Sequence, residues 1–185
     1  MKIERVWAMP NGETFSIPPV GELLQRWLSG AKTVIDPFAR NAKVGTWTND
    51  LNPHTTADYH MDVLDFLKML CQKNVVADAA VFDPPYSPRQ IKELYNGIGL
   101  PMGPREALRT SQWREERDLI HQLVRIGGIY ISFGWNSAGM GKGRGWRLEE
   151  ILLVCHGSGH NDTIVVVERK MQTRLEDAAA PAKEE

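Results

Sequence analysis

The sequence lacks a long apolar run, a cysteine framework and a strong net charge, and each absence excludes a class of protein. None of its 185 residues belongs to an apolar stretch approaching the roughly 18 residues of a membrane span, and the N-terminus lacks the basic-then-apolar pattern of a signal peptide. We therefore expect a cytoplasmic protein without a membrane partner. The 2 cysteines, Cys71 and Cys155, are far apart and have no metal-ligand spacing, so we interpret both as small core residues.

The charge of the chain is balanced overall but uneven along its length. Lys and Arg number 22 against 23 Asp and Glu, which is no global signature of nucleic-acid binding. Only residues 87–150 are net basic, and within them residues 135–147 carry Lys142 and Arg144 among several glycines and no acid. We interpret this stretch as a flexible basic loop that follows phosphates, or as a solvated glycine loop with no such role.

The length and composition are those of one domain with a real core. We expect a single domain over residues 1–170 and a polar, disordered tail over residues 171–185. His156 and His160 flank a predicted hairpin turn, but without a third ligand at a defined spacing they predict no metal site.

The most informative stretch is an apolar run that ends in an acid, two prolines and a tyrosine. Residues 75–82 are short and rich in Val and Ala, which predicts a buried parallel strand. Asp83 therefore lies at the carboxyl end of that strand, where open parallel sheets bind their ligands. Pro84 and Pro85 fix φ and remove two backbone donors, so Tyr86 is held beside Asp83 on a stiff turn with free carbonyl groups.

This local chemistry suits the amino group of a nucleobase, whose lone pair is delocalised into the ring. A carboxylate and a carbonyl that accept its hydrogens favour the nucleophilic form, and an aromatic face stacks on the base. The tetrapeptide Asp83-Pro84-Pro85-Tyr86 resembles the catalytic motif of the DNA adenine-N6 methyltransferases. The resemblance implies S-adenosylmethionine as methyl donor, these four residues as catalytic, and an adenine flipped out of DNA. Otherwise Asp83 is an acid that merely starts a Pro-Pro turn.

Acids also follow three earlier predicted strands, at Asp36, Asp50 and Asp62. An acid after the second strand of such a fold is the expected partner of ribose hydroxyls. Asp62 is equally well explained as the N-cap of the following amphipathic helix. In the resembling family a Thr-Phe run and an Asp-Pro-Phe-Ala run contact the cofactor. The resemblance therefore implies a cofactor site made by Thr14, Phe15, Asp36, Pro37, Phe38, Asp50, Leu51 and Asp62.

The sequence departs from that family directly after Asp36-Pro37-Phe38-Ala39. The family continues with glycines, which let the backbone approach the cofactor, whereas this chain has Arg40-Asn41. Too few residues separate Asp36 from Asp50 for a strand exit, a full helix and a second strand. We expect a first crossover reduced to a turn or a short helix, and a cofactor site altered by Arg40 and Asn41.

The remaining elements complete an α/β fold. Predicted strands are residues 33–35, 45–49, 59–62, 75–82, 129–133, 148–156 and 163–168, and predicted helices are residues 20–28, 63–70, 89–96 and 112–126. Parallel units followed by an antiparallel hairpin match the mostly parallel seven-stranded, Rossmann-like sheet of the class I S-adenosylmethionine-dependent methyltransferases. Substrate contacts are expected from the loops Gly97–Ser111 and Trp135–Arg147, in particular from Tyr86, Trp135, Asn136, Lys142 and Arg144.

The resemblance extends from Thr14 to Glu168 and is to small adenine methyltransferases encoded by phages and prophages, which fits a role connected with restriction-modification. It implies methylation of DNA with short or relaxed sequence specificity, by a monomer or homodimer without metal. Two alternatives stay open. One is an RNA adenine or guanine amino-methyltransferase, and the other is a nucleic-acid-binding module that has lost its cofactor.

Overall fold

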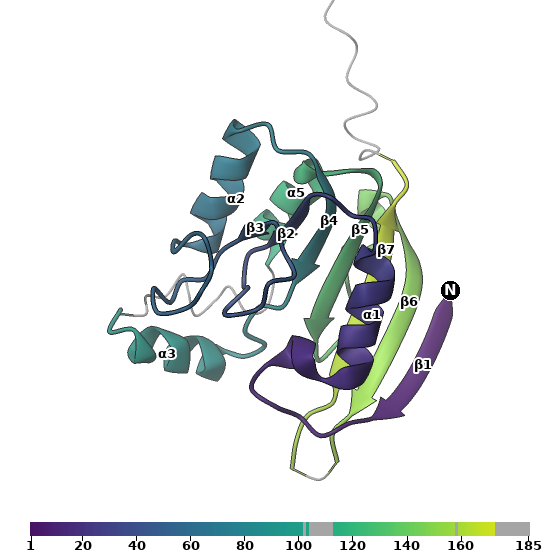
Figure 1. Ribbon diagram of the computed structural model, residues 1–185, viewed down its shortest axis with the longest axis horizontal. Coiled ribbons are helices and arrows are strands. Elements are labelled where there is room, and N and C mark those ends of the chain that lie inside the picture. Colours follow the sequence, from purple (N-terminus) through teal and green to yellow (C-terminus); the bar gives the residue numbers. More distant parts are fainter. Residues whose placement is uncertain (102, 104–112, 158, 173–185) are drawn as a thin grey trace, which may run out of the picture.

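A seven-stranded β-sheet forms the centre of the molecule in the computed structural model, which describes residues 1–101, 103, 113–157 and 159–172 (Figure 1). The strand order is β1-β6-β7-β5-β4-β2-β3. β7 runs antiparallel to both of its neighbours, and the other pairings are parallel. The strands are β1 (Lys2–Trp7), β2 (Val34–Asp36), β3 (Trp47–Thr48), β4 (Ala77–Phe82), β5 (Val124–Gly134), β6 (Trp146–Cys155) and β7 (Thr163–Lys170). This confirms the predicted mostly parallel sheet with a C-terminal antiparallel hairpin.

Helices cover both faces of the sheet. On one face α1 (Pro18–Leu28) packs against sheet residues such as Val34 and Ala79, and on the other α2 (Val63–Gln72) and α5 (Arg114–Leu123) pack against Ile35 and Ala80 (Figure 1). Successive residues of a strand point to opposite faces, which explains why neighbours in sequence belong to different cores. α3 (Pro88–Gly97) follows β4, and short 3₁₀ turns occupy Thr14–Ser16 and Lys142–Arg144. Within the part of the chain that is described, none of the helices is both long and apolar enough to cross a membrane.

Local signals account for the helix ends. α1 begins at Pro18, where the missing N–H costs nothing, and ends after Leu28 next to Gly30, whose φ of 93° suits glycine. Ser87 caps α3 by accepting a hydrogen bond from the N–H of Gln90. The predicted helix at residues 112–126 is shorter, because β5 already begins at Val124. Part of that prediction, and most of the loop Gly97–Ser111, lies outside the described residues, as do residues 173–185 of the expected tail.

The third predicted strand, at residues 59–62, is wrong. Only a single parallel bridge joins Tyr59 to Asn49, because the side chain of Asn49 takes over the next pairing. Its amide donates to the carbonyl of Met61 at 3.1 Å and accepts from the Met61 N–H at 3.1 Å. The seventh strand is instead β1, which was not predicted because only its parallel pairing with β6 makes this polar, largely exposed segment a strand.

The first crossover lacks a helix, as expected. Residues 37–46, all of them described, form turns that lead from β2 directly to β3. Gly45 lets this short connection fold back onto β2, since a Cβ at that position would lie 2.9 Å from the Cβ of Asp36. The short crossover therefore holds the ends of β2 and β3 close together.

Candidate functional site

The carboxyl ends of β2, β3 and β4 meet at one edge of the sheet and deliver three acids there. Asp36 ends β2, Asp50 follows β3, and Asp83 follows β4. Two neighbouring cavities open at this edge and share Phe38, Asp50 and Pro85 in their walls. The more polar of the two has a volume of about 350 Å³ and contains Asp83 and Tyr86. Sequence-distant residues are thus gathered into one cleft, as expected for an open parallel sheet.

Asp83 is the centre of the polar cavity. Its carboxylate accepts hydrogen bonds from the hydroxyl groups of Tyr86 and Thr14. Burial raises the pKa of Asp83 to about 6, and the two hydroxyl groups and the nearby charge of Arg40 oppose that rise. Asp83 is therefore mostly ionised at neutral pH and can accept hydrogens from an amino group.

Tyr86 is fixed by its surroundings on three sides. Its N–H donates to the side-chain carbonyl of Gln90 at 2.6 Å, and its ring meets Trp135 edge-on with centroids 5.7 Å apart. Burial and the neighbouring Asp83 raise the pKa of its hydroxyl group, which stays protonated as a donor. The predicted pairing of Asp83 and Tyr86 across the Pro-Pro turn is thus present in the structure.

Asp36 lies beneath the cleft rather than in its wall. The side chain is fully buried, and its Oδ1 accepts from the N–H of Phe38 at 3.2 Å. No described residue offers a partner to its Oδ2. Burial, with the charges of Asp83 and Asp50 adding to it, raises the pKa of Asp36 to about 8. Asp36 is therefore neutral at pH 7, and its Oδ2 is left without a partner among the described residues, under the loop that follows β2.

Asp50 and Asn49 tie the loops of the cleft together. The carboxylate of Asp50 accepts from the N–H groups of Asn52 at 2.8 Å and Arg40 at 3.1 Å. The buried amide of Asn49 donates to the carbonyl of Pro37 as well as to Met61. Burial raises the pKa of Asp50, and the hydrogen bonds from these two N–H groups partly oppose that rise. These side chains join the loops after β2 and β3 in addition to the backbone bond from the Ala39 N–H to the Asn49 carbonyl at 2.9 Å.

The second cavity is apolar and lies between the loops and α3. Its walls include Phe38 and Trp113, whose rings pack edge to face with centroids 5.4 Å apart. Asp62 lies at its border, where its Oδ1 accepts from the N–H of Leu64 and caps α2. The cap expected as an alternative is therefore present, and it keeps Asp62 in the cavity wall. An apolar cavity with a carboxylate at its border suits a flat ring that has polar groups on its edge.

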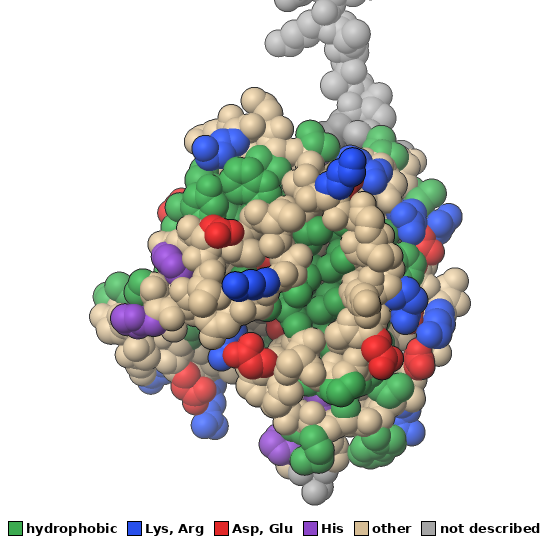
Figure 2. Space-filling model, in the orientation of Figure 1, with side chains coloured by type: hydrophobic (Ala, Val, Ile, Leu, Met, Phe, Trp, Pro, Cys, Tyr) green, Lys and Arg blue, Asp and Glu red, His purple; other side chains and the backbone are tan. Residues whose placement is uncertain are grey.

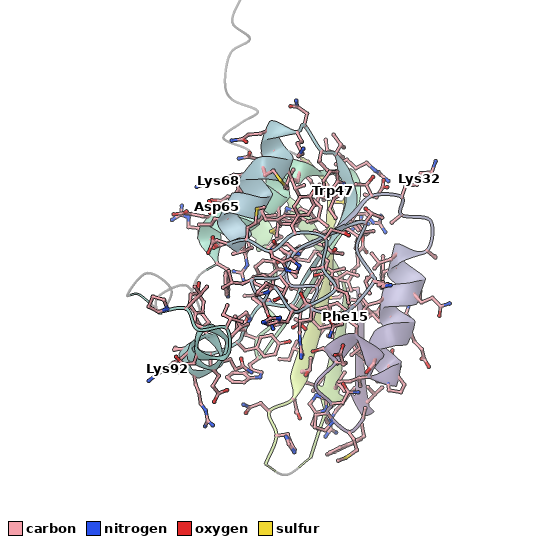
Figure 3. All side chains as sticks on the ribbon, turned by 60° about the vertical axis from the view of Figure 1, so that its left-hand side comes forward. Phe15, Lys32, Trp47, Asp65, Lys68 and Lys92 are labelled. Carbon is pink, nitrogen blue, oxygen red and sulfur yellow. The ribbon has the colours of Figure 1, made fainter. Side chains whose placement is uncertain are left out.

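The structure brings most of the predicted cofactor residues together. Thr14, Pro37, Phe38, Asp50, Leu51 and Asp62 line one or both of the two cavities. Phe15 lines a smaller adjoining hollow and packs on Phe133, with ring centroids 5.2 Å apart. Figure 3 shows Phe15 in front of the sheet near the start of α1.

The predicted substrate loop is brought to the cleft only at its start. Trp135 touches Tyr86, but Asn136 is exposed and its Oδ1 accepts from the N–H of Ala138. The guanidinium of Arg144 binds Asp118 at 2.9 Å and the carbonyl of Met140 at 2.9 Å, so it fastens the loop to α5. The side chain of Lys142 lies outside the described residues. Figure 2 shows Lys and Arg side chains scattered over one face rather than gathered into one basic patch.

Several lining residues had not been predicted. Gln90 and Leu94 enter the cleft from α3, and Asn52 and Thr55 from the loop after Asp50. The Ser-Pro start of α3 was a usable signal, because it places Gln90 one turn after Tyr86. Among the described residues, no group of three or more acids, histidines and cysteines could hold a metal ion.

Comparisons with solved structures agree with this architecture. The N-methyltransferase NodS from Bradyrhizobium japonicum WM9, in complex with S-adenosylhomocysteine, superposes with a TM-score of 0.56 and 11% identity over 88% of this chain and 89% of its own. TrmN from Thermus thermophilus gives a TM-score of 0.52 and 16% identity over 84% of this chain and 49% of its own. NSun6 from Pyrococcus horikoshii gives a TM-score of 0.53 and 14% identity over 81% of this chain and 51% of its own.

The chain has the Rossmann-like fold of S-adenosylmethionine-dependent methyltransferases. It spans about half the length of TrmN and NSun6 but nearly the whole length of NodS. No protein-family model matches the sequence, and no curated protein sequence matches it. At these identities the likeness extends to the fold, and the activity has to be argued from the cleft.

Proposed function

We propose that this protein transfers a methyl group from S-adenosylmethionine to the N6 amino group of adenine in DNA. The observation that carries the proposal is the Asp83-Pro84-Pro85-Tyr86 turn at the carboxyl end of β4, with a half-buried, ionised carboxylate beside an aromatic ring. The two cavities that meet at Pro85 offer one compartment for a cofactor and one for a base.

The residues present fit the cofactor. The apolar cavity has Phe38 and Trp113 in its walls and offers apolar contacts to an adenine ring, Asp62 stands at its border, and Asp50 offers acceptors for ribose hydroxyls. When bound, S-adenosylmethionine supplies an electrophilic methyl group on a positively charged sulfur. The acids at this edge, Asp50 and Asp83, make the cleft favourable for such a positive charge.

The chain's own residues then prepare the amino group. The Asp83 carboxylate accepts one amino hydrogen and the Pro84 carbonyl accepts the other, which draws the lone pair out of the ring and towards the methyl donor. Tyr86 and Trp135 form an aromatic corner on which a base can stack. For these contacts the amino group takes the place of the Tyr86 hydroxyl as the partner of Asp83. A base in a duplex has to be flipped into the cleft.

The test is a transfer assay with labelled S-adenosylmethionine and four substrates: duplex DNA, single-stranded DNA, duplex RNA and single-stranded RNA. Each nucleic acid is unmodified and is digested to nucleosides after reaction with the wild-type protein or the Asp83→Asn variant. The proposal predicts label in N6-methyl-2′-deoxyadenosine, and its loss in the variant.

Two results would point elsewhere. Label in a ribonucleoside alone would move the substrate from DNA to RNA while keeping the chemistry of Asp83. Absence of transfer to all four substrates, together with no binding of S-adenosylhomocysteine, would contradict the methyltransferase assignment and favour a binding module.

A further inference from the structure

Arg40 stands at the first position of the loop where the resembling enzymes carry glycine, and its backbone is unusual. Its φ is 49°, in the left-handed region that residues other than glycine rarely adopt. The residue thus keeps the backbone form of a glycine loop while adding a long cationic side chain. A strained residue beside a cleft is a reason to look for a role of its side chain.

Two hydrogen bonds hold Arg40 in that conformation. Its N–H donates to the Oδ2 of Asp50 at 3.1 Å, which joins the loop after β2 to the acid after β3. Its guanidinium reaches the carbonyl of Gly12 on the segment that precedes α1. That segment also carries Thr14, whose hydroxyl binds Asp83. The guanidinium therefore stands across the mouth of the cleft, next to the catalytic turn.

The charge around Arg40 is one-sided. Arg40 lines the polar cavity and the small adjoining hollow, and among the described residues that line the three cavities of this edge it is the sole Lys or Arg. Asp50 and Asp83 face the same space, and Asp36 lies under it. The positive groups of a ligand would find acceptors at Asp50 and Asp83. Its carboxylate would find a charged donor, among the described lining residues, at Arg40 alone.

We propose that Arg40 binds the carboxylate of the amino-acid end of S-adenosylmethionine, in place of backbone N–H groups of a glycine loop. The inference rests on the proposed function and names a binding residue for it. A guanidinium offers a planar pair of N–H donors that matches a carboxylate. Exchanging the neutral Gly12 carbonyl for a carboxylate replaces an ordinary hydrogen bond with a stronger charge-assisted one.

The experiment compares two ligands that differ in the group Arg40 is assigned to hold. S-adenosylhomocysteine has the amino-acid end, and 5′-methylthioadenosine has the same adenosine and sulfur without it. Calorimetric titrations are made with the wild-type protein, Arg40→Gln, Arg40→Gly and the control Arg147→Gln. Arg147 is an exposed arginine on β6 that pairs with Glu149, away from the cleft.

The expected result is a selective loss. Arg40→Gln and Arg40→Gly lower the affinity for S-adenosylhomocysteine by about 10- to 100-fold, the usual contribution of a hydrogen bond to a charged group. They leave the affinity for 5′-methylthioadenosine within about 2-fold of the wild-type value. Arg147→Gln changes neither affinity. Because glycine accepts a positive φ, Arg40→Gly keeps or raises the melting temperature, so its loss of affinity cannot come from unfolding.

Other outcomes overturn the inference in distinguishable ways. If the wild type binds S-adenosylhomocysteine and the Arg40 variants weaken both ligands equally, or neither, Arg40 does not hold the carboxylate and the proposed function stands. If the Arg40 variants weaken only the binding of a DNA oligonucleotide titrated in parallel, Arg40 is a phosphate contact. If the wild type binds neither small molecule, the inference falls together with the cofactor assignment.

Discussion

The two halves of the sheet are built by different means. On the hairpin side β5, β6 and β7 are 11, 10 and 8 residues long and are joined by long backbone ladders. On the cleft side β2 and β3 have 3 and 2 residues, so their ladder is short, and side chains such as Asn49 and Asp50 add further connections. Ladders satisfy every backbone group and leave none for a ligand, whereas loops held by side chains keep N–H and C=O groups at a cleft. The long ladders stabilise the hairpin side, and under the proposed function the cleft side carries the chemistry.

The largest expected effect is a loss of methyl transfer when an acid of the cleft side is changed, compared with an acid of the hairpin side as control. Asp83→Asn removes a charged acceptor from the catalytic turn and should lower methyl transfer by about 10²- to 10⁴-fold with little change in melting temperature. Asp162→Asn changes an acid of the hairpin turn, whose Oδ1 accepts from the His156 N–H, and should leave transfer intact. Rates measured with both variants check this. Equal losses of rate would mean that the cleft is not the place of reaction.

A second pair of variants compares a side chain that joins loops at the cleft with a core residue of a long strand. Asn49→Ala leaves the Met61 and Pro37 groups unpaired and should cost about 2–4 kcal/mol of stability, together with cofactor affinity. Val165→Ala opens a cavity in β7 and should cost roughly 2 kcal/mol while keeping cofactor affinity. Urea unfolding and calorimetry measure both quantities. Retained affinity in Asn49→Ala would contradict the role given to its amide.

The buried acid under the cleft makes stability depend on pH. The pKa of Asp36 is about 8 in the folded protein, above its value in the unfolded chain, so between these values the folded state holds the extra proton. Its contribution is therefore fully present at low pH and is lost as the pH rises towards and through 8. Asp36→Asn has no such proton to lose, and its stability relative to the wild type should rise by on the order of 4 kcal/mol between pH 5 and pH 8. A pH-independent difference in the free energy of unfolding would contradict this.

The smallest predicted effect is a pH dependence of the rate. Asp83 has to be ionised to accept an amino hydrogen, and its pKa is about 6. kcat/KM should therefore be nearly constant above pH 7 and fall about tenfold per pH unit well below 6. Rates measured from pH 5 to 8 give the midpoint. A profile that keeps its full value at pH 5 would show that Asp83 is not titrated in the free enzyme near this pH.

The same contrast explains what could be predicted from the sequence. α1, α2 and α3, the Asp83 turn and the hairpin carry local signals in apolar period, caps and prolines, so they were found with small shifts of their ends. The short crossover followed from counting residues. β1 is a strand only through its pairing with β6, and the bridge at Tyr59 is cut short by the Asn49 side chain, so neither has a local signature.

Site residues divide in the same way. Asp50 and Asp83 were predicted because they follow strands, whose carboxyl ends must meet. The role of Arg144 depends on Asp118, a residue 26 positions away, and the entry of Trp113 into the apolar cavity depends on a long connection after α3. Such partners are set by tertiary packing, which the pattern of a single segment does not contain.

The central claim, that the cleft side of the sheet is the cofactor site, is tested most directly by NMR titration of the labelled protein with S-adenosylhomocysteine. The account predicts that the amide signals of Phe38, Arg40, Asp50 and Asp62 shift, while those of β6 and β7 stay in place. Saturable shifts confined to β6 and β7, or no shifts at all, would contradict it.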